Sequence, residues 1–360
     1  MDKFSPLASR FVGASPGIGR RAFLAGMVGA GTLGLAACAR DASGTGTLAL
    51  SANLPKTVSA TTSLVIAPVT AQLALRASGQ LGKLPFTVSS WPNLQAGPDV
   101  IEAFRAKALD LAENAGIPPI QAQATGLPVR IVAVGLNRKP EYWPVTAPGS
   151  DITSASQFRG KKLGFSQGQA QGVVLLRILA QAGISTKDVD LVALTSDQFT
   201  TALEAKQVDV AVMSQPDLQE YLNGFAREGA HVISTNVVDY LDVLWSPVEV
   251  LEDEAKAAAI KAYIPFWAQS AVWQYENQAT WIQTYYVANQ HLTTAQGELI
   301  VKSAGKPLFP PSWDSAITWE RETAKLLAAG GYDSAIDASQ LFDRRFEGIA
   351  SAAVPATYRS

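Results

Sequence analysis

Two residue types that build many active sites are scarce in this chain of 360 residues. It has a single cysteine, Cys38, and two histidines, His231 and His291. One cysteine cannot form a disulfide within the chain. The scarcity also argues against a zinc site with several cysteine or histidine ligands and against a Cys–His catalytic pair. We therefore expect no metal site and no cysteine-based catalysis.

An excess of charge of one sign is also missing. Lys and Arg number 29 and Asp and Glu number 31, so the formal net charge is −2. Proteins that bind nucleic acid usually carry a clear basic excess, so we expect no nucleic-acid partner. Hydrophobic residues make up 48% of the chain, which predicts a globular body with a sizeable core.

Long apolar runs are absent apart from one near the N-terminus, Phe23 to Ala37. At about 15 residues this run is shorter than the roughly 20 that a membrane-spanning helix needs. It is preceded by four basic residues, Lys3, Arg10, Arg20 and Arg21. A basic start, a short apolar core and small residues at the end are typical of an export signal, which we predict over residues 1–37.

Two short motifs add detail to this signal by resemblance. The stretch RRAFLAG, beginning at Arg20, resembles a twin-arginine export signal, and LAAC, ending at Cys38, resembles a bacterial lipobox. In lipobox proteins the cysteine is lipidated and becomes the first mature residue. The alternatives are the general export route and an ordinary cleaved signal with a chance cysteine. We expect an exported protein in the periplasm or at the outer face of the cytoplasmic membrane, anchored through Cys38.

Beyond the signal, residues 38–60 are small and polar, which is typical of a flexible tether. The pattern then alternates between short apolar strands and amphipathic helices over residues 63–113, and again over residues 161–214. A strand-helix-strand-helix-strand order predicts a parallel sheet covered by helices. The segment Ala103–Ala112 (AFRAKALDLA) matches Ala202–Ala211 (ALEAKQVDVA) at five positions, 99 residues apart. A duplicated unit explains this match better than chance does.

Two such units predict an α/β protein of two lobes with a cleft between them. The first lobe would comprise residues 61–135 and 236–360, with a helical C-terminal part, and the second lobe residues 136–235. In open α/β sheets ligands bind beyond the carboxyl ends of the strands. The segments expected there are 67–70, 91–97, 113–117, 166–172, 195–198 and 214–217. Neither histidine falls in these segments.

Several segments resemble the substrate-binding proteins of nitrate/sulfonate/taurine-type ABC transporters over roughly residues 60–300. They are LQAGPDVIEAFRAKALDLAENAGIPP, GLPVRIVAV, SASQFRGKKLGFSQG, AGISTKDVDLVAL and DQFTTALEAKQVDVAVMSQP. The resemblance implies a type II periplasmic-binding-protein-like fold that closes around one small molecule. It also implies a monomer that works with a membrane permease and an ATPase, without a cofactor and without catalysis. The ligand that it implies is a small organosulfonate or a similar oxoanion.

The loop Ser166–Gly172 follows a predicted strand and opens a predicted helix. It lacks the lysine of a P-loop and the GxGxxG spacing of a dinucleotide loop, which leaves a helix N-terminus whose free N–H groups bind anions or carbonyl oxygens. Amides, which both donate and accept, recur at the predicted cleft positions. The candidate ligand-binding residues are Thr70, Trp91, Gln95, Asn114, Ser166, Gln167, Gly168, Gln169 and Gln215. Beside them, Glu113 is either a solvated acid at a strand end or a carboxylate placed to bind an ammonium group.

Three alternatives to a sulfonate importer remain open at this point. The uncharged amides suit a neutral or heterocyclic ligand, such as a thiamine-precursor pyrimidine, as well as an oxoanion. Two-lobed folds also host enzymes, so an enzyme acting on a small carboxylated substrate is a second reading. A tethered sensor subunit without a transporter is the third.

Overall fold

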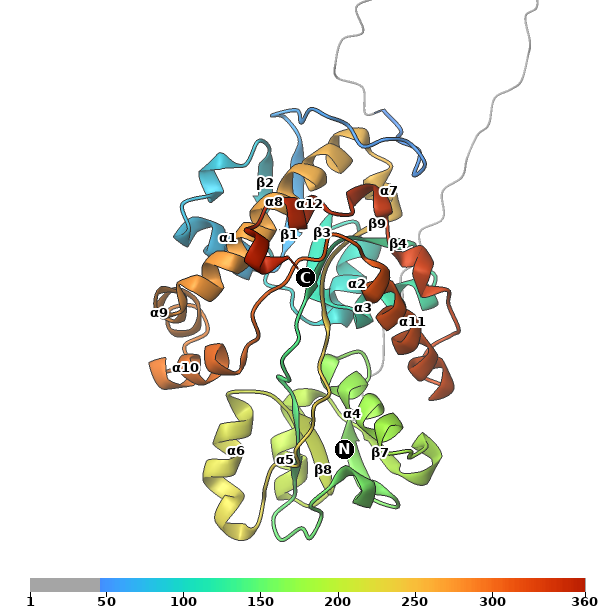
Figure 1. Cartoon of the computed structure of the whole chain (residues 1–360), viewed down its shortest axis with the longest axis vertical. Helices are drawn as coiled ribbons and strands as arrows, with labels where there is room; N and C mark the ends of the chain where they lie inside the picture. Colours follow the sequence, from blue (N-terminus) through green and yellow to red (C-terminus); the bar gives the residue numbers. More distant parts are fainter. Residues whose placement is uncertain (1–45, 360) are drawn as a thin grey trace, which may run out of the picture. The chain divides into compact units, whose positions relative to one another are not determined.

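The computed structural model describes residues 46–359, so the predicted signal, Cys38 and the first part of the predicted tether lie outside the described residues. The described chain forms a five-stranded sheet in the order β2-β1-β3-β9-β4 and a four-stranded sheet in the order β5-β8-β6-β7 (Figure 1). We call the five-stranded sheet with helices α1–α3 and α7–α12 lobe 1. The four-stranded sheet with helices α4–α6 is lobe 2. This arrangement confirms the predicted two-lobed α/β class.

Lobe 1 is discontinuous in sequence, because β9 joins its sheet only after the chain has built lobe 2. β1 pairs in parallel with β2 and β3, whereas β9 runs antiparallel to its neighbours β3 and β4. The strands are β1 Ser63–Ala67, β2 Thr87–Ser90, β3 Leu111–Ala115, β4 Val129–Leu136 and β9 Leu241–Pro247. The helices are α1 Val69–Ala77, α2 Gly97–Arg105, α3 Ile117–Ala124, α7 Val248–Leu251, α8 Glu254–Glu276, α9 Gln278–Trp281, α10 Thr294–Ser303, α11 Asp314–Ala329 and α12 Ile349–Ala352.

In lobe 2, β6 pairs in parallel with β7 and β8, and β5 runs antiparallel to β8. Its strands are β5 Trp143–Thr146, β6 Lys162–Phe165, β7 Asp190–Ala193 and β8 Val210–Met213. Its helices are α4 Ala170–Gln181, α5 Phe199–Glu204 and α6 Asp217–Phe225. A π-helix, η6 Ile282–Val287, follows α9 in lobe 1. Short 3₁₀ turns are η1 Leu81–Lys83, η2 Ala155–Phe158, η3 Thr186–Asp188, η4 Ser196–Gln198, η5 Ala226–Glu228, η7 Ala338–Leu341, η8 Arg344–Phe346 and η9 Ala356–Tyr358.

The aspartates of the repeated segment have the same structural task in both lobes. Asp110 accepts a hydrogen bond from the backbone N–H of Val65 at 2.8 Å, and Asp209 accepts one from Lys162 N–H at 2.7 Å. Each carboxylate therefore links the start of one strand to the neighbouring strand. The equivalence gives structural support to the duplication that the sequence indicates.

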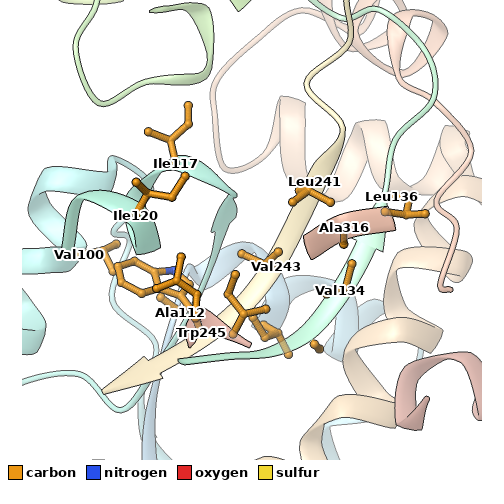
Figure 2. Close-up of a cluster of buried hydrophobic side chains, with 14 of the residues drawn as sticks. Val100, Ala112, Ile117, Ile120, Val134, Leu136, Leu241, Val243, Trp245 and Ala316 are labelled. Atoms are coloured by element: carbon orange, nitrogen blue, oxygen red, sulfur yellow. The ribbon is translucent and has the colours of Figure 1, made fainter. Parts of the chain in front are cut away.

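The hydrophobic core of lobe 1 continues into α4 of lobe 2. Trp245 on β9 is fully buried and meets Phe104 of α2 edge-on, with the ring centroids 4.8 Å apart. Figure 2 shows Trp245 close to Ala112 of β3 and Val100 of α2. The buried residues of α4, from Val173 to Leu179, belong to the same cluster, whereas a smaller core around Phe199 and Leu203 fills the other face of the lobe 2 sheet. The two lobes are thus joined by packing as well as by the crossing chain.

Residues 46–60, predicted to belong to a tether, are part of lobe 1, so the prediction is wrong for this segment. Leu48 is buried, and its N–H donates to the carbonyl of Glu252 at 2.7 Å. Leu50, Leu54 and Val58 pack against the core. The physical reason is that these apolar side chains, although widely spaced among small polar residues, stabilise the folded state by burying apolar surface against lobe 1. Across residues 46–359, no helix combines the length and apolar character that a membrane crossing requires.

Candidate functional site

A cavity of about 590 Å³ lies where the two lobes meet. It is lined by the first turns of α1, α2 and α4, by the end of β3 and the start of β9, and by one face of α8 with η6 beside it. This volume suits one small molecule. Five of the nine candidate residues line it, namely Thr70, Gln95, Asn114, Gly168 and Gln169.

On the lobe 1 side, Asn114 holds the loop that leads into α2. Its Nδ2 donates to the carbonyl of Gln95 at 2.9 Å, and its Oδ1 accepts from Trp245 Nε1 at 2.9 Å. Gln95 Nε2 in turn donates to the Tyr285 hydroxyl at 3.1 Å, which leaves its Oε1 as the free end of the amide. Asn114 is therefore a positioning residue, and Gln95 is the better candidate for ligand contact.

On the lobe 2 side, the start of α4 faces the cavity with Gly168, Gln169, Ala170 and Gln171. Gly168 has φ of +84°, the left-handed region that favours glycine. No side chain of the described residues caps α4, because Gln169 instead accepts from Ser196 N–H with its Oε1 at 3.0 Å. The first-turn N–H groups and the Gln169 Nε2 are thus placed to bind an oxygen of a ligand.

The starts of α2 and α4 approach each other closely. A Cβ added at Gly97 would lie 2.5 Å from Pro118 Cγ and 3.4 Å from the carbonyl oxygen of Gly168. Within α4, a Cβ at Gly172 would lie 2.1 Å from the carbonyl oxygen of Ser166. Both glycines are therefore required by close packing. They bring two helix N-termini to the same end of the cavity, where their partial positive charges add.

Four of the candidate residues lie outside the cavity lining. Trp91 follows the edge strand β2 and packs on Tyr263 of α8, with the ring centroids 6.3 Å apart. The Ser166 side chain is turned into the core, and Gln167 is exposed and donates to the Tyr332 carbonyl at 3.1 Å. Gln215 buries its Oε1 before the turn into α6.

The lining also includes residues that sequence reasoning missed. α8 contributes Trp267, Ser270, Ala271 and Gln274, whose spacing of three and four residues places them on one helix face. This spacing indicates that the four residues share a face of α8. The sequence does not show which face of so long a helix borders the cavity. Asp242 of β9 was missed because β9 reaches the cavity only through its pairing with β3 and β4.

The charged groups of the lining are Glu113 on β3 and Asp242 on β9, and none of the described lining residues is Lys or Arg. Burial and the adjacent Glu113 carboxylate raise the pKa of Asp242 well above its ordinary value. Burial also raises the pKa of Glu113, whereas the nearby Trp267 indole and the Asp242 carboxyl oppose that rise. Two carboxyl groups this close do not both ionise readily, which agrees with the raised pKa of each.

Two lobes, each with a largely parallel sheet, and a ligand-sized cavity between opposed helix starts define the periplasmic-binding-protein class of fold. Comparison with known proteins places the chain near one group of that class. Residues 93–242 match the family described as NMT1/THI5 like. The resemblance expected from the sequence is confirmed.

Two curated relatives are described as aliphatic sulfonates-binding proteins. The chain is 31% identical to the one from Escherichia coli K12 over 134 residues, which is 37% of this chain and 42% of that protein. It is 22% identical to the one from Bacillus subtilis 168 over 257 residues, which is 71% of this chain and 76% of that protein.

Solved structures that share the fold include two sulfonate-binding proteins. The periplasmic aliphatic sulphonate binding protein SsuA from Escherichia coli gives a TM-score of 0.69 at 20% identity, covering 79% of this chain and 98% of that one. The alkanesulfonate-binding protein SsuA from Xanthomonas axonopodis pv. citri, solved bound to MOPS, gives 0.64 at 20% identity, covering 84% and 100%.

Proposed function

We propose that this protein is the extracytoplasmic solute-binding subunit of an ABC importer, and that it captures a small organosulfonate or a similar oxoanion. The observation that carries the proposal is the pair of helix starts, α2 and α4, that converge on one cavity from different lobes. Backbone N–H groups at helix N-termini bind oxoanions without charged side chains. The relatives described as sulfonate-binding proteins support the same ligand class.

The binding step follows from how the lining is divided between the lobes. Gln95 and Gly97 belong to lobe 1, and Gly168 and Gln169 belong to lobe 2, so the groups that would hold the oxoanion come together only when the lobes meet. Closure around the ligand would also create the surface that a permease recognises. Opening separates the two helix starts and releases the oxoanion. The protein therefore carries its ligand without changing it.

The cellular setting belongs to the same proposal. An exported body held to the membrane by a lipidated Cys38 would meet the permease and ATPase as a monomer, with an export signal over residues 1–37. Replacing Cys38 by Ala tests the anchor, since the anchored protein fractionates with membranes and the variant should be released. A variant that stays on the membrane would contradict lipidation.

Titration calorimetry of the full exported chain, kept soluble with a mild detergent, tests the ligand class. Simple alkanesulfonates, nitrate, amines and pyrimidines form the panel. A ligand at 100 times its Kd should also raise the free energy of unfolding by about 2.7 kcal/mol. Binding of a pyrimidine with no response to any oxoanion would instead support the heterocyclic ligand. Mass spectrometry of the recovered ligand addresses the enzyme reading, because a product there would contradict a pure binding role.

A further inference from the structure

The end of α11 forms a turn that contacts lobe 2 from lobe 1. The turn comprises residues 330–332, and we call it the α11 turn. Gly331 has φ of 74°, and the N–H of Tyr332 donates to the Leu327 carbonyl at 3.0 Å. This is the hydrogen bond of a Schellman motif, in which a left-handed glycine ends the helix. A Cβ at Gly330 would lie 2.3 Å from Tyr332 Cε2, so the tyrosine ring lies over that glycine. The two glycines therefore fix the direction of the Tyr332 side chain.

The ring and the backbone carbonyl of Tyr332 both contact the segment that leads into α4. The ring packs on Phe165, the last residue of β6, with the ring centroids 4.4 Å apart and the planes tilted by 35°. The Tyr332 carbonyl accepts a hydrogen bond from Gln167 Nε2 at 3.1 Å. Further along α4, Arg177 donates to Thr323 Oγ1 of α11 at 2.6 Å. Lobe 1 thus contacts α4 along its length and also the chain just before its first turn.

The loop between β6 and α4, residues 166–169, decides where the first-turn N–H groups of α4 point. Gly168 and Gln169 line the cavity, and no side chain in the described part of the chain caps α4. Such a helix start binds a ligand oxygen only when its N–H groups lie within hydrogen-bond distance of that oxygen. Tyr332 is not among the described lining residues. Its contacts can therefore affect a ligand only through this loop.

We propose that Tyr332 is a positioning residue for ligand binding: from lobe 1, it holds the β6–α4 loop of lobe 2 in the conformation that directs the α4 N–H groups into the cavity. The inference rests on the proposed function, because it takes the start of α4 as a ligand-binding group. Since the contacts of Tyr332 join the two lobes, they stabilise the arrangement in which both halves of the site are together. Removing the ring should weaken the binding of every ligand by a similar factor.

Two measurements on the full exported chain test this role, and the first needs no ligand. Hydrogen exchange followed by mass spectrometry reports how readily the amides of residues 166–173 open to solvent. Tyr332→Ala should raise the exchange rate of this segment about threefold or more, whereas Tyr332→Phe, which keeps the ring, should match the wild type. The second measurement is calorimetry with butanesulfonate. Tyr332→Ala should lower its affinity by about threefold to tenfold, the range expected for the loss of one aromatic pair.

Phe225→Ala is the matched control. Phe225 is also partly buried, and its ring packs on Tyr221 with a similar tilt of 34° and a centroid distance of 5.1 Å, but this pair lies entirely within α6 of lobe 2. The control variant should lose stability while the exchange of residues 166–173 and the affinity for butanesulfonate stay unchanged. The comparison separates a positioning role from a general loosening of the fold.

Gly331→Ala is the second variant, for the case that circular dichroism shows Tyr332→Ala to be unfolded. The new methyl group would meet nothing within 4 Å, so the substitution strains only the left-handed backbone of the α11 turn. It leaves lobe 2 untouched. Exchange of residues 166–173 should again become faster and the affinity for butanesulfonate lower.

The outcomes separate this inference from the proposed function. Faster exchange together with weaker binding in Tyr332→Ala, with Tyr332→Phe and Phe225→Ala like the wild type, supports the inference. Unchanged exchange in Tyr332→Ala, an equal rise in Phe225→Ala, or faster exchange with full affinity would overturn it and leave the proposed function in place. If the wild type binds neither butanesulfonate nor any other oxoanion, the proposed ligand class is overturned, and faster exchange in Tyr332→Ala would still support the positioning of the loop by Tyr332.

Discussion

Lys107 and Lys206 have the same left-handed backbone conformation, with φ of 55° and 54°, at equivalent points of the two repeated units. Each N–H donates to a carbonyl three residues earlier, Phe104 in one lobe and Leu203 in the other. Each lysine lies just beyond the end of a helix, α2 or α5, where the chain turns towards the next strand. A residue with a Cβ pays roughly 1–2 kcal/mol for this conformation.

Lys206→Gly should therefore stabilise the protein, because glycine adopts this backbone without strain. After subtracting the greater chain entropy of glycine in the unfolded state, we expect a gain of about 0.5 kcal/mol in the free energy of unfolding. Urea unfolding followed by circular dichroism measures it. Lys325→Gly, at an exposed position inside α11, is the control and should cost about 1 kcal/mol. A loss of stability in Lys206→Gly would contradict the strain.

Gly97→Ala should impair ligand binding through sterics alone. The new methyl group would overlap Pro118 and press towards the Gly168 carbonyl, so the two helix starts could no longer meet as they do. Overpacking of this kind costs roughly 1–3 kcal/mol, which corresponds to at least a fivefold loss of affinity if the strain falls on closure. Gly82→Ala, whose Cβ would meet nothing within 4 Å, is the control. Unchanged affinity in Gly97→Ala would show that this contact is not needed for binding.

Arg177 on α4 is bound to α11 of the other lobe. Its Nη2 donates to Thr323 Oγ1 at 2.6 Å and to the Trp319 carbonyl at 3.3 Å, and its guanidinium lies 3.4 Å from the Trp319 ring centroid. Arg177→Met should weaken the closed arrangement of the lobes and lower the affinity for every ligand by a similar factor.

Small-angle scattering of the ligand-bound protein checks this expectation, since the variant should have a larger radius of gyration. Arg159→Met is the control, because Arg159 forms a half-exposed ion pair with Asp188 inside lobe 2. Exposed pairs of that kind contribute about 0–1 kcal/mol, so affinity should hold. A ligand-selective effect of Arg177→Met would argue against a role in closure.

Stability should fall as the pH rises towards neutrality, the reverse of ordinary acid denaturation. Burial raises the pKa of Asp239 to about 7 from an ordinary 3.8, with a further rise from the Glu141 carboxylate and an opposing effect of Arg177. Between these two pKa values the folded protein holds a proton that the unfolded chain has lost, so each step up in pH favours unfolding. Below the lower value both states are protonated, and above the upper value both are ionised.

Asp239→Asn should remove part of this pH dependence and raise the free energy of unfolding at neutral pH by roughly 1–3 kcal/mol. Urea unfolding of both proteins at several pH values from about 4 to about 8 measures the slopes. The exposed acid Glu102, replaced by Gln, serves as the control. Equal slopes in the wild type and Asp239→Asn would contradict a raised pKa in the folded state.

The elements that repeat locally could be predicted from the sequence. Apolar runs give β1, β3, β6 and β8, and the glycine loop before α4 lies at the cavity as expected. Side-chain direction at the ends of strands could not be predicted. Gly168 lines the cavity while its neighbour Gln167 is bonded to Tyr332 on the outside, because the left-handed φ of Gly168 turns the chain between them.

The lining residues on β9 and α8 could not be predicted for a different reason. Asp242 and Trp267 reach the cavity from elements that come after lobe 2. The position of Asp242 depends on the pairing of β9 with β3 and β4, strands more than 100 residues earlier in the chain. The sequence allows Glu113 to be either a solvated acid or an ammonium ligand. It does not show that Asp242 lies beside Glu113, because that depends on the pairing of β3 with β9. Long-range pairing therefore decided the electrostatic character of the site.

The packing of residues 46–60 on lobe 1 also fixes where the autonomous folding unit begins. Lys261 donates to the Pro55 carbonyl at 3.1 Å, and Arg345 Nη1 donates to the Ala49 carbonyl at 3.2 Å, so α8 and the C-terminal region both use this segment as a partner. A chain cut at residue 60 would lose these acceptors and expose the apolar surface under Leu50 and Leu54. The stretch that reads as a mere spacer is thus the outermost layer of the folded body.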